Sequence, residues 1–309
     1  MIHVVAPGML TSVQDLGRHG FAHLGVGTAG AMDSPALRLA NALVGNEDNA
    51  AALEVTLRGP TLRFDTPTLI ALTGGEVATP MWRPVFIDAE TTLDIGALHS
   101  GCRTYLAVAG GLRAPMLMSS RSADINGGIG RALVAGDTLA HDPYVEAASH
   151  AAWSLDPAPW FDAHDDAPIH LIRGAHFAHL DATSRKTLFT REFRIDTQSN
   201  RVGYRLTGET LRLSEPLELI SEGVTPGTVQ LPPGGAPIVL MREAPTTGGY
   251  PRIGHIASVD LPRLAQRRPG QIVRFADISP ADARTMYLRR ERELRVLQRS
   301  IADRRDTNR

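Results

Sequence analysis

The first residues whose types and spacing could do chemistry lie near the N-terminus, in the segment PGMLTSVQDLGRHGFAHLGVGTAGAMD (residues 7–33). Gln14, Asp15 and Arg18 stand there among several glycines. Glycine lets the backbone approach a ligand closely and exposes N–H groups that can receive an anion or a developing oxyanion. We therefore predict a site here, with Asp15 as a candidate catalytic residue and Gln14 and Arg18 as binding residues. The alternative is a series of turns in which Asp15 pairs with Arg18.

Two further polar residues interrupt apolar patterns in the first half. Asn41 falls inside a predicted helix, where an asparagine costs helix propensity unless its amide has a partner, and we include it among the substrate-binding residues. Glu54 enters the apolar strand AALEVTL, so it either faces solvent or is a buried carboxylate. A buried carboxylate would be a candidate catalytic acid or base.

The second half offers a loop built for a small polar ligand, PTTGGYPRIG (residues 245–254). Two hydroxyls, two unhindered N–H groups and a flat phenol suit a planar amide or carboxylate. The predicted substrate-binding residues are Thr246, Thr247, Gly248, Gly249 and Tyr250, with Gln230 from the preceding loop. The alternative is a plain hairpin whose glycines only permit positive φ.

The same half also supplies ionic candidates, Glu243 and Arg201. An amide carbonyl gains negative charge when it is activated, and N–H groups, Asn, Gln and Arg can stabilise that charge. Asp15, Glu54 or Glu243 could act as base, while Arg18 or Arg201 could hold a substrate carboxylate. Spacing does not decide between them.

The elements that must position these residues are mostly short β-runs separated by Gly and Pro, such as TLIALTGG, TYLAVAGG and PIVLM. Such runs predict a mainly β protein. Residues 34–44 read as a helix, because Asp33 or Ser34 can cap it, Pro35 opens it and Gly45 ends it. Residues from 279 to about 303 read as an amphipathic terminal helix, with Tyr287 on its apolar stripe.

We divide the chain accordingly into four parts. Residues 1–150 form an N-terminal β-rich half, 151–167 a crossover rich in Ala, Asp, His and Pro, 168–278 a second β half, and 279–309 a helix and tail.

Composition narrows the function classes. The formal net charge of −1 gives no field towards nucleic acid or an anionic membrane. Cys102 is the only cysteine, which excludes disulfides and cysteine-cluster zinc sites within the chain and suits a cytoplasmic protein. No GxxxxGK[ST] phosphate loop is present, and Lys186, the only lysine, does not lie between methionines as a biotin-carrying lysine would. The histidines show no metal-ligand spacing, so we predict no metal site.

Several strings resemble one known family in colinear order from about residue 3 to about residue 280. The clearest are VQDLGRHGFAHLGVGTAGAMDSPALRLANALVGN, TYLAVAGG, SNRVGYRLTG, SEGVTPGTVQLPPGGAPIVLM and TTGGYPRIG. They resemble the family variously called allophanate hydrolase subunit 2, KipA-like, or the C component of 5-oxoprolinase. The same domain forms part of the carboxyltransferase region of biotin-dependent urea carboxylase.

This resemblance implies two β-rich, cyclophilin-like barrel halves and a partner chain of the KipI-like type, which is the B component of 5-oxoprolinase. It implies three functions to be weighed. The first is one component of an ATP-dependent 5-oxoprolinase, acting with the A and B components and inactive alone, with ATP bound at this chain or at another. The second is half of a carboxyltransferase that acts on urea or another amide, with biotin on a partner chain. The third is a non-enzymatic protein that sequesters a KipI-like kinase inhibitor.

The chain departs from the family pattern at candidate loops. Asn200 stands where members carry Asp, and residues 243–245 (Glu-Ala-Pro) replace Asp-x-Gln. Residues 174–176 (Gly-Ala-His) replace Gly-Pro-Gln, and SSRSADINGG (residues 119–128) matches Gly-Ser-x-Ser-Thr only loosely. The resemblance therefore supports the fold of this chain more strongly than it supports a particular substrate.

Overall fold

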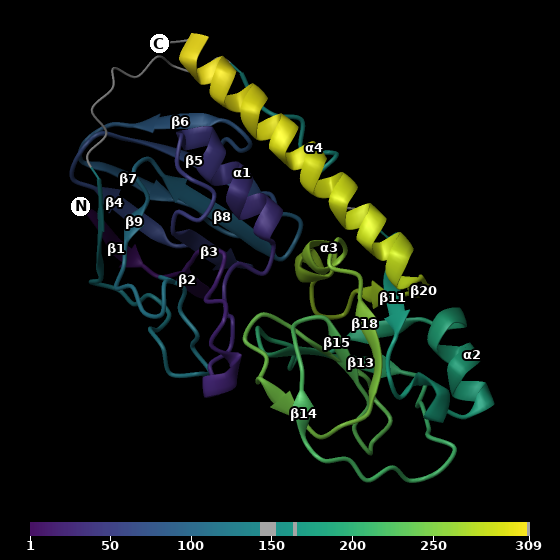
Figure 1. Ribbon diagram of the computed structural model, residues 1–309. Coiled ribbons are helices and arrows are strands. Elements are labelled where there is room, and N and C mark those ends of the chain that lie inside the picture. Colours follow the sequence, from purple (N-terminus) through teal and green to yellow (C-terminus); the bar gives the residue numbers. More distant parts are fainter. Residues whose placement is uncertain (143–152, 163–165, 308–309) are drawn as a thin grey trace. The chain divides into compact units, whose positions relative to one another are not determined.

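Figure 1 shows the computed structural model, which describes residues 1–142, 153–162 and 166–307. Its internal contacts divide the chain into two compact units. Unit 1 comprises Met1–Arg18, Ala29–Ala163 and Arg292–Arg309, and unit 2 comprises His19–Thr28 and His164–Glu291. Strands outnumber helices in both, so the predicted mainly β fold is confirmed. Residues 153–162, assigned above to a crossover, belong to unit 1.

Unit 1 is built from two five-stranded sheets. The first has the order β7-β4-β1-β10-β9 and the second the order β2-β3-β8-β5-β6. The strands are β1 (Ile2–Ala6), β2 (Leu10–Gln14), β3 (Ala52–Thr56), β4 (Thr61–Phe64), β5 (Thr68–Gly74), β6 (Pro84–Ile87), β7 (Thr91–Asp94), β8 (Arg103–Val108), β9 (Leu112–Arg113) and β10 (Thr138–His141).

Side-chain alternation along the strands explains how the second sheet is covered on both faces. Ile70 and Leu72 of β5 pack in a core with Ile2 and Phe64 of the first sheet. The intervening residues Leu69 and Ala71 pack instead against the helix α1 (Ser34–Val44). Successive residues of a strand point to opposite faces, so a strand buried on both sides reads as a continuous apolar run.

The helix α1 coincides with the predicted range 34–44 and has the expected signals at both ends. Asp33 Oδ1 accepts the N–H of Ala36 at 3.1 Å, which makes it the N-cap. Gly45 ends the helix in the left-handed conformation, with φ of 79°. The cap and the stop are local features, which is why the sequence predicts this element well.

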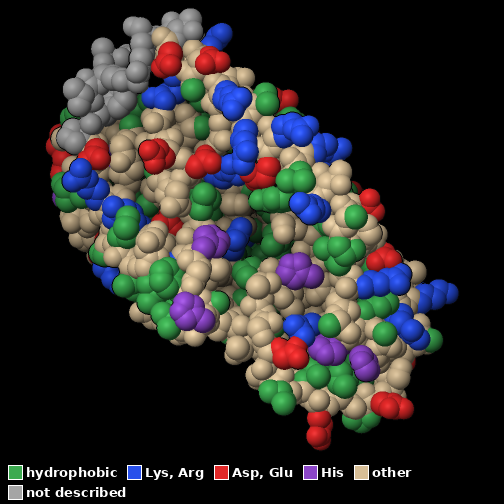
Figure 2. All heavy atoms as spheres, in the orientation of Figure 1, with side chains coloured by type: hydrophobic (Ala, Val, Ile, Leu, Met, Phe, Trp, Pro, Cys, Tyr) green, Lys and Arg blue, Asp and Glu red, His purple; other side chains and the backbone are tan. Residues whose placement is uncertain are grey.

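The terminal helix α4 (Pro280–Thr307) extends the predicted helix by a few residues. Its residues 280–291 belong to unit 2 and those from 292 on to unit 1. Leu294 and Ile301 are buried with Leu39, Trp82 and Phe161 of unit 1. Its other faces carry exposed arginines, and Figure 2 shows basic side chains along this helix. Tyr287, which we expected on the apolar stripe, is 43% exposed.

Unit 2 is an eight-stranded sheet with the order β19-β12-β13-β16-β15-β18-β11-β20, accompanied by the two-stranded ribbon β14-β17. The strands are β11 (Ile169–Arg173), β12 (Phe193–Ile195), β13 (Gly203–Gly208), β14 (Glu222–Gly223), β15 (Thr228–Gln230), β16 (Ile238–Leu240), β17 (Thr247–Gly248), β18 (Arg252–Ile256), β19 (Ile272–Val273) and β20 (Phe275–Asp277).

The eight-stranded sheet curls into a nearly closed barrel. Its two edge strands, β19 and β20, are separated in sequence only by Arg274, so the chain itself joins the edges. Phe193 of β12 and Phe275 of β20 lie 5.8 Å apart between ring centroids. The helices α2 (Ala182–Thr190) and α3 (Leu261–Gln266) and the 3-10 turn η2 (Phe177–His179) complete this unit, and η1 is Ala22–Leu24. No helix in the described part of the chain is long and apolar enough to cross a membrane.

Candidate functional site

Asp15 lies at the end of β2 and organises the polar cluster of unit 1. Its Oδ1 accepts hydrogen bonds from Gly17 N (2.8 Å), Ser120 Oγ (2.7 Å) and Ser122 Oγ (2.5 Å). Its Oδ2 accepts the N–H of Arg121 at 2.6 Å. Asp15 is 1% exposed, and both of its carboxylate oxygens accept hydrogen bonds. Asp15 therefore holds residues 119–122 in place.

Ser120, Arg121 and Ser122 are therefore site residues that the sequence analysis did not select. They lie in the segment SSRSADINGG, which matches the family pattern only loosely. The segment begins in a tight turn in which Met118 (φ 51°) and Ser119 (φ 59°) are both left-handed. Such conformations cost about 1 kcal/mol or more for residues with a Cβ, so the bonds to Asp15 hold a strained turn.

Arg18 is the second component of the cluster, and it does not pair with Asp15. One guanidinium nitrogen, Nη2, donates to the carbonyl of Ser122. Nε and Nη1 are buried and have no hydrogen-bond partner among the described residues. The alternative in which Asp15 and Arg18 form a structural pair is therefore not what the structure shows.

Gln14 also reaches the same segment from β2. Its Nε2 donates to the carbonyl of Ala123 and to Ser12 Oγ, both at 3.0 Å. Its Oε1 is buried and finds no partner in the described ranges of the chain. The structure thus brings Gln14, Asp15 and Arg18 together at residues 120–123.

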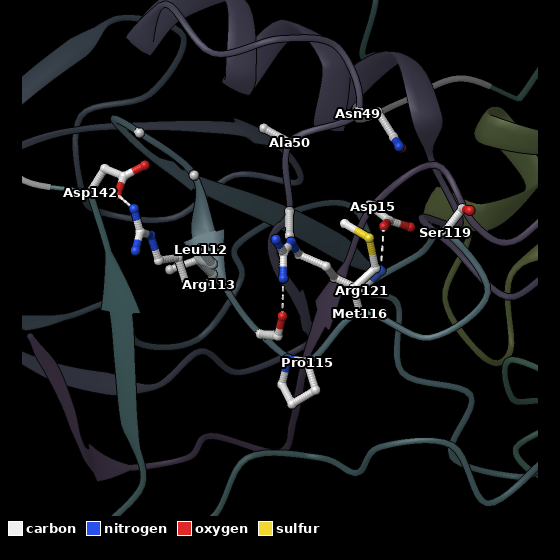
Figure 3. Close-up of a pocket in the computed structure, with 14 residues that line it drawn as sticks. Asp15, Asn49, Ala50, Leu112, Arg113, Pro115, Met116, Ser119, Arg121 and Asp142 are labelled. Carbon is white, nitrogen blue, oxygen red and sulfur yellow. Dashed lines mark hydrogen bonds and ion pairs between the residues drawn. The ribbon is translucent and has the colours of Figure 1, made fainter.

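Two cavities flank this cluster and share part of their lining. The first, which we call the Asp15 cavity, has a volume of about 610 Å³ and is drawn in Figure 3. There Arg121 reaches the carbonyl of Ala114, and Arg113 pairs with Asp142. The second, which we call the Arg18 cavity, has a volume of about 660 Å³. Both volumes lie within the range typical of small-ligand pockets.

The close fit of the backbone at this cluster depends on Gly30. A Cβ added there would overlap the backbone of Leu16 and Gly17, directly before Arg18. Ala31 N also donates to the carbonyl of Asp15 at 2.9 Å. The glycine-rich segment thus serves a close backbone approach, as predicted for its composition.

Glu54 is buried rather than facing solvent. Its Oε2 accepts from Tyr105 Oη (2.7 Å) and from Met32 N (2.8 Å), and Oε1 lies 3.6 Å from Arg103 Nε. Burial raises the pKa of the Tyr105 phenol, and the Glu54 carboxylate adds to the rise, so the phenol remains a donor. Neither cavity described above is lined by Glu54.

Asn41 has local structural partners. Its Nδ2 donates to the carbonyl of Ala50 at 2.7 Å, and its Oδ1 accepts from Asn46 Nδ2 at 3.0 Å. These bonds tie the end of α1 to the following turn, and they satisfy the amide that helix propensity alone would disfavour.

In unit 2, Arg201 and Glu243 form a buried ion pair. Arg201 Nε lies 2.5 Å from Glu243 Oε1, and the side chains are 3% and 0% exposed. The Glu243 N–H also donates to the carbonyl of Arg201 at 2.8 Å. The carboxylate and the guanidinium that we selected separately are thus partners of each other.

The loop at residues 245–254 forms part of the ribbon β14-β17. Thr247 pairs with Gly223 and Gly248 with Glu222, and Thr246 accepts the N–H of Val224 through its carbonyl. Gly248 and Gly249 are not among the positive-φ glycines, so the plain-hairpin explanation for them is wrong. At Gly248 the reason is space, since a Cβ would overlap Gln230 Nε2. Thr247 and Tyr250 are exposed.

Gln230 and a small cavity lie close to this ribbon. Gln230 Nε2 is buried, and no described residue accepts a hydrogen bond from it. The cavity has a volume of about 220 Å³ and is lined partly by Gly223, Arg252 and His255. His176, where the family pattern has Gln, accepts the N–H of Arg252 through Nδ1 at 3.0 Å. Burial lowers the pKa of His176, and Arg252 adds to the effect.

The predicted catalytic carboxylates are not gathered in one place. Asp15 and Glu54 belong to unit 1 and Glu243 to unit 2. In the described part of the chain, no group of three or more His, Cys, Asp and Glu residues could hold a metal ion. The Asp15 cluster presents hydrogen-bond donors and acceptors, including Arg18 Nε and Nη1 and Gln14 Oε1.

Comparison with known proteins adds what geometry alone does not give. Residues 24–277 match the family described as carboxyltransferase domain, subdomain A and B. The chain belongs to this family.

Relatives within the carboxyltransferase-domain family carry more specific names. The chain is 40% identical to the C component of 5-oxoprolinase from Escherichia coli K12, over 92% of this chain and 93% of that one. It is 36% identical to the C component of 5-oxoprolinase from Haemophilus influenzae, over 98% of this chain and 99% of that one. The resemblance identified from the sequence is thereby confirmed.

A solved structure of the carboxyltransferase-domain family shows the same fold in a much longer protein. The urea carboxylase of Kluyveromyces lactis superposes with a TM-score of 0.84 at 28% identity, over 95% of this chain. This chain spans only 29% of that protein.

Proposed function

We propose that this chain is the C component of an ATP-dependent 5-oxoprolinase, which opens the lactam of 5-oxoproline to glutamate together with partner chains, the A and B components. The observation that carries the proposal is the likeness to two proteins named as the C component of 5-oxoprolinase over nearly their whole length. A shared fold alone would not imply a shared function, and the proposal rests instead on sequence similarity over nearly the whole of both chains.

The reaction adds water across the C–N bond of a five-membered lactam that carries a carboxylate. Such a substrate presents a negative group, an amide N–H and a carbonyl oxygen that gains charge when it is activated. The Asp15 cluster offers complementary groups, namely the N–H groups of Arg18 and the Oε1 of Gln14 that no described residue binds. ATP would bind at a partner chain or at an interface with one.

Within this proposal Asp15 is a positioning residue that does not itself react with the substrate. Four donors occupy its oxygens, so it holds Ser120, Arg121 and Ser122 in place and is not free to take a proton from substrate. Glu54 and Glu243 are engaged by Tyr105 and Arg201 in the same way. We therefore assign the reacting acid or base to none of these three carboxylates, and infer that it comes from a partner chain.

The test is to co-express the chain with its A and B partners and to measure glutamate released from 5-oxoproline with and without ATP. We expect ATP-dependent release from the complete complex and none when this chain is omitted. A well-assembled complex that releases no glutamate would contradict the proposal. It would leave the regulatory alternative, in which the chain binds a KipI-like inhibitor tightly and turns nothing over.

The second candidate is a carboxyltransferase half that uses biotin on a partner. It is favoured by the match to the carboxyltransferase-domain family and by the likeness to urea carboxylase. Avidin separates the two functions, because it sequesters biotin. Glutamate release that continues unchanged in avidin supports the 5-oxoprolinase, whereas avidin-sensitive carboxylation of urea or another amide supports the carboxyltransferase.

A further inference from the structure

The strongest unexplained feature of the molecule is a buried cation without a counter-charge among the described residues. Arg18 is 1% exposed, and arginine is protonated at any physiological pH. Its Nη2 donates to the Ser122 carbonyl, but the Nε hydrogen and both Nη1 hydrogens have no acceptor within the described ranges. Burying a charge without a partner is costly, so such a group is retained where something else supplies the partner.

Arg18 lines the Arg18 cavity, whose volume is about 660 Å³. The nearest carboxylate in sequence, Asp15, cannot serve as the missing partner because its oxygens are bound to Gly17, Ser120, Arg121 and Ser122. An unsatisfied donor set therefore opens onto a space large enough for a small molecule.

The other charges around the cavity indicate how much negative charge the occupant carries. Arg131 is paired with Asp137, and Arg113 with Asp142. Asp15 accepts the backbone N–H of Arg121, and the Arg121 guanidinium donates to the Ala114 carbonyl. The four arginines named here, Arg18, Arg113, Arg121 and Arg131, exceed the three carboxylates, Asp15, Asp137 and Asp142, by one positive charge. A monoanion satisfies it, whereas a dianion would leave negative charge over.

Part of the cavity wall is apolar. Pro115, Ile129, Leu133 and Leu139 contribute to its lining. Apolar walls favour a ligand with a hydrocarbon body, and the guanidinium favours a carboxylate, which accepts charge-assisted hydrogen bonds from it.

We propose that the Arg18 cavity is a binding site for a small monocarboxylate with a compact body, and that Arg18 receives the carboxylate. The inference rests on the proposed function for the identity of the ligand, 5-oxoproline. Its chemical class follows from the cavity alone.

The test compares two probes that differ only in the carboxylate. Calorimetry measures the dissociation constants of L-5-oxoproline and of 2-pyrrolidinone, the same lactam without the carboxylate, on the purified chain and on the assembled complex. We expect the acid to bind at least about tenfold more tightly, because a hydrogen bond to a charged group is worth that much or more.

Variants at Arg18 then locate the effect. Arg18→Met should weaken the acid by about ten- to a hundredfold and leave 2-pyrrolidinone unchanged, and Arg18→Lys should fall between because it keeps the charge and loses the planar donor set. Arg63→Gln is the matched control, since Arg63 is a half-exposed arginine of β4 paired with Asp65 and Glu90. Unchanged binding of the neutral lactam also shows that Arg18→Met is folded.

Three results would overturn the inference: equal affinity for the two probes, acid binding that survives Arg18→Met, or no binding of the acid to chain or complex. The experiment distinguishes failure of this inference from failure of the proposed function. A complex that releases glutamate equally well with Arg18→Met removes the inference and keeps the function. Selective, Arg18-dependent binding of the acid by a complex that releases no glutamate keeps the site and removes the function.

Discussion

Arg18 of unit 1 and Arg201 of unit 2 are both almost fully buried, yet their surroundings differ. Arg201 lies 2.5 Å from a carboxylate oxygen of Glu243, and the two residues are also joined through their backbones. Arg18 has no such carboxylate among the described residues, because the one three residues away is bound to the 119–122 segment. A buried arginine that the fold has neutralised stabilises the fold, whereas one left without a counter-charge is available to a ligand.

The largest expected effect on stability comes from replacing Arg201, and it is compared with the effect of replacing Arg18. Arg201→Met should lower the free energy of unfolding of unit 2 by about 3–5 kcal/mol, because Glu243 would be left buried and unpaired. Arg18→Met should cost about 1 kcal/mol or less, since it removes one hydrogen bond and also a buried unpaired charge. Urea unfolding followed by circular dichroism measures both.

The double variant Arg201→Met/Glu243→Leu is the control for that comparison. It should recover most of the stability, because replacing both members of a buried pair by apolar groups is often neutral. Equal losses for Arg18→Met and Arg201→Met would show that the two arginines have the same structural role.

The next largest effect should come from Asp15. Asp15→Ala removes the acceptor of four hydrogen bonds and should destabilise unit 1 by about 3 kcal/mol, since several buried donors lose their partner. Asp15→Asn keeps one acceptor oxygen, so its stability should lie between that of the unaltered protein and that of Asp15→Ala. Hydrogen exchange of the Arg121 amide reports the local effect, and an unchanged exchange rate in Asp15→Ala would contradict the role of Asp15 as anchor.

A smaller effect is expected at Gly248, where unit 2 also buries a group that no described residue binds, Gln230 Nε2. Gly248→Ala should cost about 1 kcal/mol, because the buried Gln230 side chain must shift away from the new Cβ. Gly249→Ala is the matched control, with its nearest non-neighbouring atom, Ser221 Oγ, at 3.3 Å, and should change stability by about 0.5 kcal/mol or less. The midpoint of thermal unfolding distinguishes the two variants. Equal shifts of the midpoint for Gly248→Ala and Gly249→Ala would contradict a specific clash at Gly248.

The smallest effect concerns pH and the histidines of unit 2. Burial lowers the pKa of His255 below its ordinary value of 6.5, and the pKa of His176 is lowered as well. The unfolded chain then binds more protons, so the stability of unit 2 should fall as the pH drops below about 6.5 towards the lowered values. His255→Gln should flatten this slope in urea titrations at several pH values, and an unchanged slope would exclude His255 as its cause.

Features set by near neighbours in sequence were predictable. The helix 34–44 follows from Asp33, Pro35 and Gly45, all within or next to the helix, and the structure has it at Ser34–Val44. The mainly β fold follows from short apolar runs between Gly and Pro, and the C-terminal helix from its polar and apolar periodicity. The alternation of β5 between two apolar faces explains why its run TLIALTG is continuous.

Partners far apart in sequence were not predictable from one chain. Ser120 and Ser122 bind Asp15 across more than a hundred residues, so no spacing links them. Arg201 and Glu243 were both selected for their charge, but that they neutralise each other depends on how β13 and β16 pair. The loose match in the segment SSRSADINGG was the one available signal for the serines.

The terminal helix α4 has a consequence for how the protein is made. Leu39, Trp82 and Phe161 of unit 1 are buried with Leu294 and Ile301. A ribosome synthesises the three early residues long before the two late ones, at about 5–20 residues per second. During that interval the nascent chain lacks the part of the cover that Leu294 and Ile301 supply, so the last helix to be synthesised completes the first unit. A chain stopped before residue 294 would leave that part of the surface exposed permanently.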